Sequence, residues 1–151
     1  MAPPPPLPRH WRHRVTKRGL QLFDEGCNCA EAVLRACLEE YGLDPALYRL
    51  ATGLGAGMGT RRDLCGLLTG CVLVVGLLNE RGEPGEVAAK RRAYGPAASI
   101  YDWFAQHGGV HCTDIVRDHP FRAHTAACRR TLVGALRQLE QLVPPPPEPG
   151  A

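Results

Sequence analysis

The sequence predicts an all-α fold, a compact single-domain bundle of about five or six helices. Two observations support this class. Several segments carry apolar residues at the three- and four-residue spacing of a helix, with Gly or Pro between them, and strand-like alternation is absent. The length of 151 residues and the 44% hydrophobic content fit one domain with its own core.

Proline-rich stretches mark both ends of the chain. Residues 1–10 and 144–151 are rich in proline, which favours extended polyproline conformations, so both are expected to be tails. The helical domain is therefore expected to cover residues 11–143.

The first half of this domain contains clear helix boundaries. A helix is expected over Trp11–Glu25, where Gly26 stops it. Asn28 is a favourable N-cap for a second helix over Cys29–Tyr41, and Gly42 ends that helix.

The middle of the chain combines a glycine-rich loop with an apolar run. Asp44-Pro45 begins a short helix, and four glycines between residues 53 and 59 form a loop. Residues 64–78 form an uncharged run of 15 residues, and a buried helix is expected over 64–79 with Asp63 as its cap.

Helices are also expected in the second half. Residues 86–106 form one helix, which Gly95-Pro96 should kink or break. After a turn at 107–110, a short helix covers Cys112–Val116. The final amphipathic helix is expected over Phe121–Val143, with a buried stripe made of Leu132, Ala135, Leu136, Leu139 and Val143.

Four of the seven cysteines provide the main functional lead: Cys29, Cys65, Cys112 and Cys128. They lie on four separate elements, so only the fold can bring them together, and they predict one shared redox or metal site. Cys29 and Cys65 each open a helix, where unpaired N–H groups and the helix dipole favour the thiolate. Each could equally be a small buried hydrophobe.

Gly66 and Gly70 lie one helical turn apart just after Cys65. Small residues at this spacing let another backbone approach closely. Such packing is one way to bring Cys65 near the sulfur of another element.

The other three thiols are expected to differ from these four. Cys37 and Cys71 lie inside apolar helices and are interpreted as packing residues. Cys27 forms a Cys-x-Cys pair with Cys29, which could chelate a metal or form a strained disulfide. An odd total fits reduced or ligating cysteines better than a complete disulfide set.

Histidines offer a competing zinc site. His111 adjoins Cys112, and His124 precedes Cys128 by one helical turn, so a Cys2His2 set could assemble in space. The spacing matches no compact zinc finger. The glycine-rich loop lacks both the P-loop ending and the dinucleotide fingerprint, which argues against nucleotide binding.

Charge and hydropathy set the expected surroundings. The apolar run is shorter than a membrane span, and no apolar leader follows the N-terminal methionine, so the protein is expected to be cytoplasmic. The net charge is +3, and basic residues crowd the start of the first helix without a recognised binding motif, so nucleic-acid binding is not expected. A homo-oligomer is compatible with the sequence.

A longer pattern resembles a known family. It comprises Gly26-x-Asn28-Cys29-Ala30-Glu31-Ala32-Val33, a loop ending in Gly57-Met58-Gly59, Cys65-Gly66-x-x-Thr69-Gly70, Gly108-Gly109 before Cys112, and Cys128. This order resembles the family of redox-active proteins named for the pattern C_GCAxxG_C_C, also written CGAxxG. The resemblance covers most of residues 20–140.

The resemblance implies a small, mainly helical protein in which Cys29, Cys65, Cys112 and Cys128 are the four shared cysteines. One departure is Leu67, which stands where the family has alanine and could narrow access to Cys65. Some related domains associated with cytochromes use such cysteines around an iron centre. This chain has no Cys-x-x-Cys-His motif, so covalent c-type haem is not expected.

The leading functional hypothesis is thiol–disulfide or electron-transfer chemistry at these four cysteines, as in a thiol-dependent oxidoreductase. The redox partner would be a protein or a small oxidant. The first alternative is an iron–sulfur or zinc site with the same cysteines as ligands. The second is a non-catalytic helical interaction module in which the cysteines only pack.

Overall fold

The computed structural model describes residues 11–79, 81–117 and 126–147. In these ranges the chain is all-helical, which confirms the predicted class. It has seven α-helices rather than the five or six expected, in part because the glycine-rich segment predicted to be a loop contains the one-turn helix α3. In order, the elements are α1 (Trp11–Asp24), α2 (Cys29–Glu40), the 3-10 helix η1 (Pro45–Leu54), α3 (Gly55–Met58), α4 (Gly66–Leu77), α5 (Val87–Gln106), α6 (Cys112–Val116) and α7 (Ala126–Leu142).

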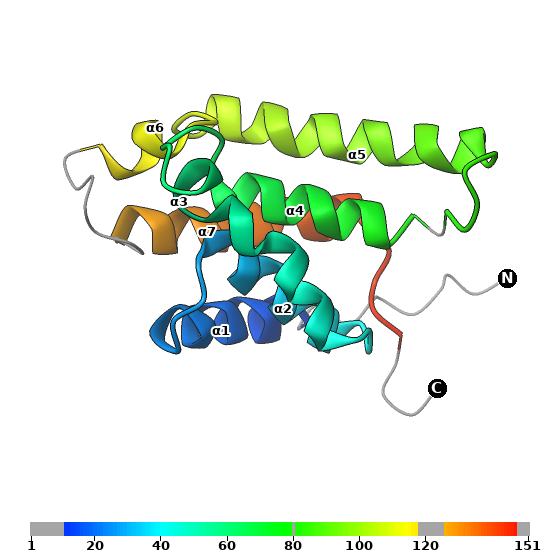
Figure 1. The fold of residues 1–151 in the computed structure, drawn as a ribbon, viewed down its shortest axis with the longest axis horizontal. Coiled ribbons are helices and arrows are strands. Elements are labelled where there is room, and N and C mark those ends of the chain that lie inside the picture. Colours follow the sequence, from blue (N-terminus) through cyan, green and yellow to red (C-terminus); the bar gives the residue numbers. More distant parts are fainter. Residues whose placement is uncertain (1–10, 80, 118–125, 148–151) are drawn as a thin grey trace, which may run out of the picture.

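Helix α4 runs through the middle of the bundle (Figure 1). It packs against α2 on one side, α5 on another and α7 behind, while α1 packs against α2 and α7. This placement explains why the α4 sequence carries no charge and is apolar except for Thr69: neighbours cover most of its circumference. None of the helices in the described ranges combines the length and the hydropathy needed to cross a bilayer.

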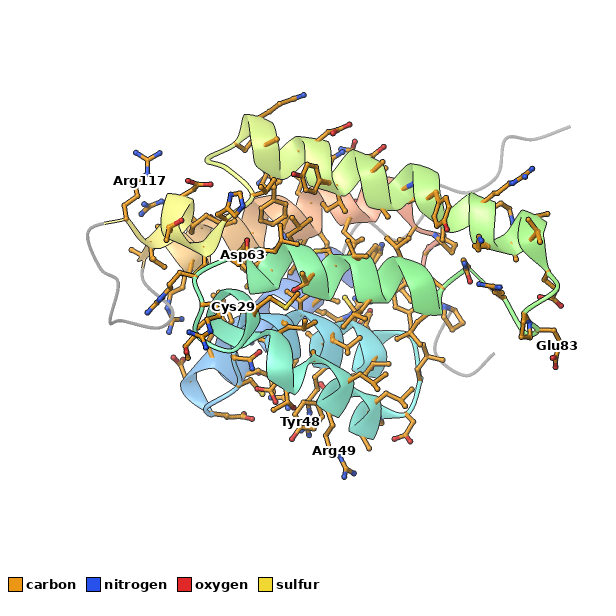
Figure 2. The ribbon with its side chains drawn as sticks, turned by 45° about the horizontal axis from the view of Figure 1, so that its top comes forward. Cys29, Tyr48, Arg49, Asp63, Glu83 and Arg117 are labelled. Atoms are coloured by element: carbon orange, nitrogen blue, oxygen red, sulfur yellow. The ribbon has the colours of Figure 1, made fainter. Side chains whose placement is uncertain are left out.

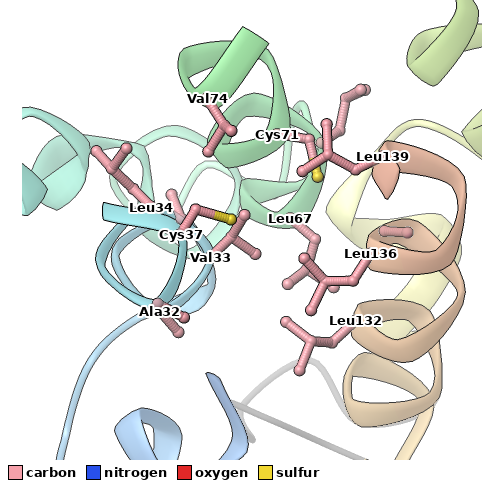
Figure 3. Packing of buried hydrophobic residues seen from close by; sticks show 14 of the residues in the cluster. Ala32, Val33, Leu34, Cys37, Leu67, Cys71, Val74, Leu132, Leu136 and Leu139 are labelled. Carbon is pink, nitrogen blue, oxygen red and sulfur yellow. The ribbon is translucent and has the colours of Figure 1, made fainter. Parts of the chain in front are cut away.

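The core lies between α2, α4 and α7 (Figure 3). Leu132, Ala135, Leu136 and Leu139 of the predicted α7 stripe are buried, whereas Val143 is half-buried beyond the end of the helix. Cys37 and Cys71 are 2% and 0% exposed among these side chains, which confirms their predicted packing role. The expected start of this helix, at 121–125, lies outside the described residues.

The basic residues of α1 form ion pairs within the fold. Arg14 Nη2 lies 2.5 Å from Glu40 Oε1, and Arg18 bonds to both Glu39 and Glu25, at 2.8 and 3.0 Å. Much of the basic cluster noted in the sequence therefore joins α1 to α2.

One predicted helix cap is wrong, and of the kink or break expected at Gly95-Pro96 the break does not occur. Asp63 does not cap the buried helix; Cys65 is the N-cap residue of α4, and the Asp63 carbonyl instead accepts a hydrogen bond from the Cys112 N–H at 2.6 Å. Helix α5 also continues through Pro96 instead of breaking. Arg92, four residues earlier, is exposed, so water can satisfy the carbonyl that Pro96 leaves without a partner.

Candidate functional site

Two glycines on α4 let this helix approach the start of α2 closely. A Cβ atom built on Gly66 would lie 3.0 Å from the Cys29 Cβ, and one on Gly70 would lie 3.0 Å from the Ala30 carbonyl oxygen. Contacts this short are tighter than ordinary van der Waals packing, so side chains at these positions would push the helices apart. The predicted close approach is confirmed, and it brings the Cys65 end of α4 against Cys29.

A polar network fixes the backbone at Cys29. The Asn28 side chain accepts a hydrogen bond from the Glu31 N–H at 2.9 Å, and the Glu31 carboxylate accepts one from the Asn28 N–H at 3.0 Å. Asn28 Nδ2 also donates to the Thr52 carbonyl, and the Thr52 hydroxyl donates to Glu31. The predicted N-cap is therefore confirmed as a full capping box that is also tied to η1.

A short backbone pairing joins the segments that carry Cys65 and Cys112. The Cys65 N–H donates to the Val110 carbonyl at 2.8 Å, and the Cys112 N–H donates to the Asp63 carbonyl. Leu64 and His111 form the isolated antiparallel bridge between these bonds. The pairing fixes the separation of two cysteines that lie 47 positions apart in the sequence.

The glycine-rich loop forms a left-handed turn beside this pairing. Five consecutive residues, 56–60, have positive φ, and Ala56, Met58 and Thr60 are not glycine. Arg62 also has a positive φ, of 61°. Non-glycine residues in this region are strained, and such strain is concentrated at functional sites.

The fold brings the four predicted cysteines together. Cys29 and Cys128 are hydrogen-bonded through their side chains, and Cys65 and Cys112 lie close enough to act on Cys29 electrostatically. All seven cysteines are thiols. Cys29, at the start of α2 (Figure 2), is half-buried, whereas Cys65, Cys112 and Cys128 are 4%, 8% and 5% exposed.

The predicted activation of Cys29 and Cys65 by helix dipoles is wrong. The hydrogen bond to Cys128, and then burial, raise the pKa of Cys29 well above its usual value. The Glu31 N–H at this helix start donates to the Asn28 side chain, so it is not available to stabilise a Cys29 thiolate.

Cys65 has the dipole interaction that the sequence predicts, but it is outweighed. Burial raises the pKa of Cys65 to about 12, although the N–H groups of Leu67 and Leu68 act to lower it. At this position the free energy lost by removing a thiolate from water is larger than the stabilisation that two backbone N–H groups provide.

A cation that the sequence patterns do not indicate contacts the Cys112 thiol. Arg62 Nη1 lies 3.5 Å from the Cys112 Sγ as a hydrogen-bond donor. The signal available in the sequence was the Arg61-Arg62 pair between the glycine-rich loop and Cys65.

The carboxylates on this side of the molecule face His111. Its Nε2 and Nδ1 atoms lie 3.4 Å from Asp63 and 3.4 Å from Asp114, respectively. Asp63, which is paired with Cys112 through the backbone, and Asp114 therefore both have His111 as a partner.

The arrangement gives no support to a metal site. Among the residues that the structure describes, no group of three or more His, Cys, Asp or Glu side chains is placed to hold a metal ion. His124 of the predicted zinc set lies outside those residues. Cys27 of the Cys-x-Cys pair is a half-buried thiol whose pKa is raised by burial and by Glu31.

A comparison with protein families matches this region. The model of the family described as "Putative redox-active protein (C_GCAxxG_C_C)" matches residues 27–142. The matched range begins just before Cys29 and includes all four clustered cysteines. No curated protein and no solved structure matches the chain.

Proposed function

The chain belongs to the C_GCAxxG_C_C family, and on that premise we propose that it is a thiol–disulfide redox protein whose Cys29 and Cys128 thiols form a reversible disulfide. The observation that carries this proposal is the hydrogen bond between these two side chains. Two thiols that interact as hydrogen-bond partners are neighbours in the fold, which is the first requirement for a disulfide between them.

The reaction is a two-electron exchange with a disulfide of a partner protein or a small molecule. One site thiolate attacks a sulfur of the partner disulfide, forms a mixed disulfide and releases the first partner thiolate. A second site thiolate then attacks the mixed disulfide and releases the second partner thiolate. The site is oxidised to a Cys29–Cys128 disulfide, the partner is reduced to two thiols, and the two protons of the site thiols end on the partner sulfurs.

Burial separates this pair from simple surface cysteines. Cys128 is 5% exposed and Cys29 is half-buried, so Cys29 is the more accessible of the two residues to a partner. A buried thiol that is mostly protonated resists random oxidation, because only the thiolate reacts readily. These features support a disulfide that forms by exchange with a docked partner.

The test is to count and map thiols in the full-length protein. The reduced protein is incubated with oxidised glutathione, and thiols are counted under denaturing conditions before oxidation, after it and after reduction. Tryptic mass spectrometry then identifies the linked peptides. We expect a reversible loss of two thiols with Cys29 joined to Cys128.

Cys71→Ala is the matched control, because Cys71 is a fully buried thiol on α4 in the core. It should lose the same two thiols as the unmodified sequence. A protein that loses no thiols, or whose disulfide joins residues outside the four clustered cysteines, would overturn the proposal. Stoichiometric iron with sulfide absorption in an anaerobic preparation would overturn it too.

A further inference from the structure

Arg62 gives Cys112 a cationic partner that the structure shows for neither Cys29 nor Cys65. The guanidinium Nη1 lies 3.5 Å from the Cys112 Sγ, and Arg62 is half-buried. A cation in hydrogen-bond contact favours the thiolate, and guanidinium remains charged throughout the physiological range. The contact therefore favours the form of sulfur that attacks disulfides.

The backbone on both sides of Arg62 is held in place. The Arg62 N–H donates to the Ala56 carbonyl at 3.1 Å, and the Thr113 N–H donates to the Arg62 carbonyl at 3.4 Å. Arg62 itself is in the left-handed region, with φ at 61°. The strained turn and the α6 segment thus hold the backbone of Arg62 beside the residue that begins α6, and from there its guanidinium contacts the Cys112 Sγ.

Cys29 and Cys65 have the opposite surroundings. A thiol neighbour and burial hold Cys29 in its protonated form, and burial does the same for Cys65 despite the N–H groups at the start of α4. Asp63, whose carbonyl accepts from the Cys112 N–H, and Asp114 are turned toward His111. Cys112 therefore differs from Cys29 and Cys65 in having a described contact with a cation.

We propose that Arg62 is a positioning residue that holds Cys112 as the attacking thiolate of the site. This assignment rests on the proposed thiol–disulfide function. Cys112 attacks the partner disulfide and releases the first partner thiolate, and Cys29 then attacks Cys112 and releases the second. Cys128 finally attacks Cys29, which forms the Cys29–Cys128 disulfide and expels Cys112 as the thiolate that Arg62 stabilises.

The same contact serves two steps of this sequence. In the first step, only the thiolate form of Cys112 attacks the partner disulfide. In the last step, the stabilised Cys112 thiolate is a good leaving group when Cys128 attacks Cys29. No oxidant beyond the partner disulfide is required, because the last step only moves the disulfide from one cysteine to another.

The experiment measures the alkylation rate of each cysteine in the reduced full-length protein. Limiting iodoacetamide is added at neutral pH, the reaction is quenched at intervals, and peptide mass spectrometry gives a rate for each thiol. Cys112 should react fastest of the four clustered cysteines, despite its 8% exposure. Arg62→Gln should lower the Cys112 alkylation rate about tenfold, because loss of a hydrogen bond to a charged group changes an equilibrium by about that factor or more. The rates of the other cysteines should stay within about twofold.

Three variants separate the charge contact from a structural effect. Arg62→Lys keeps a cation and should restore part of the Cys112 rate, whereas Gln should not. Neither change adds backbone strain, because each side chain carries the same Cβ atom as arginine. Arg61→Gln removes an exposed positive charge one residue away and should leave the Cys112 rate unchanged.

The assignment is overturned if Cys112 reacts no faster than Cys29 and Cys128, or if Arg62→Gln leaves its rate unaltered. Equal losses in the Arg61→Gln and Arg62→Gln variants would overturn it as well, since net charge would then explain both. A normal Cys29–Cys128 disulfide together with slow Cys112 alkylation rejects the role of Arg62 alone. Absence of that disulfide rejects the proposed function.

Discussion

Helices α2 and α4 each belong to two chemically different regions. At their N-terminal ends, Cys29 and Cys65 face the thiols of α6 and α7. Two turns along α2 and less than two turns along α4, Cys37 and Cys71 are buried among leucine and valine side chains (Figure 3). Burial raises the pKa of both Cys65 and Cys37 to about 12, so burial does not distinguish the two regions.

The two regions differ in what surrounds the sulfur. Cys29 of the candidate site is half-buried, and the thiols of this site lie beside a strained loop and one guanidinium. Cys37 and Cys71 also act on each other electrostatically, but they are 2% and 0% exposed. A thiol that no partner disulfide can reach is inert, because exchange needs the attacking sulfur in line with the disulfide. The contrast predicts that equal substitutions in the two regions have unequal effects.

The largest effect is expected when one cysteine is removed from each region of α2. Cys29→Ser removes the thiol that resolves the mixed disulfide, so oxidised glutathione should leave glutathione bound to Cys112 and form no internal disulfide. Cys37→Ala should form the internal disulfide as the unmodified sequence does. Intact-mass measurement after oxidation tests both, and an internal disulfide at an unchanged rate in Cys29→Ser would remove the distinction between the regions.

Glycines on α4 provide the next contrast. Gly70→Ala places a Cβ 3.0 Å from the Ala30 carbonyl oxygen and 3.1 Å from the Val33 Cβ. Overpacking of this kind should lower the free energy of unfolding by about 1–3 kcal/mol, and it should also slow disulfide formation.

Gly76→Ala is the matched control on the same helix. No atom lies within 4 Å of the position of its Cβ, and alanine favours helix, so this variant should be as stable or more stable by up to about 1 kcal/mol. Urea unfolding of both variants under reducing conditions measures the difference. Equal stabilities would show that α2 and α4 do not depend on the close approach.

A pair of helix caps gives a smaller contrast. Asn28→Ala removes the capping box at Cys29 and should cost about 1.5 kcal/mol. Asp44→Ala removes a cap of η1, where the side chain accepts from the Ala46 N–H at 2.9 Å, and should cost about 1 kcal/mol.

Only the Asn28 substitution is expected to slow formation of the Cys29–Cys128 disulfide, because it frees the backbone that positions Cys29. Thermal unfolding and the rate of thiol loss, measured on the same samples, separate the two effects. If the rate of thiol loss falls equally in both variants, general destabilisation of the fold explains the slower disulfide formation.

Local rules predicted most of the fold. Asn28, Gly42 and Asp44 mark boundaries through their own backbone and capping chemistry, so the sequence alone locates them. Whether Pro96 breaks its helix could not be predicted, because the outcome depends on whether water can reach the exposed residue one turn earlier, which is a tertiary property.

The sequence could predict which cysteines form the candidate site, but it could not predict their pKa values. The family pattern and the small residues Gly66 and Gly70 indicated which cysteines meet. The pKa values of Cys29 and Cys65 depend on burial and on neighbouring thiols that arrive from α7, and no local pattern reports these. Arg62 escaped notice because its contact requires the pairing of residues 62–65 with 110–113.

The smallest expected effect is in alkaline stability, and it should be similar in both regions. The pKa of Cys37 is raised to about 12, first by burial and then by Glu40. A raised pKa in the folded state means that folding favours the protonated thiol. This contribution is fully present below the ordinary value of about 9 and is lost as the pH rises toward 12.

Between pH 9 and pH 10 this linkage should cost the protein about 1 kcal/mol for each such thiol. Urea unfolding under reducing conditions at both pH values should therefore show a fall in stability that is about 1 kcal/mol smaller in Cys37→Ala than in the unmodified sequence. Cys65→Ala should show the same reduction, because burial is the main cause at both positions. A reduction in Cys37→Ala alone would mean that the surroundings of Cys65 stabilise its thiolate. The two regions would then differ in how strongly they disfavour a thiolate.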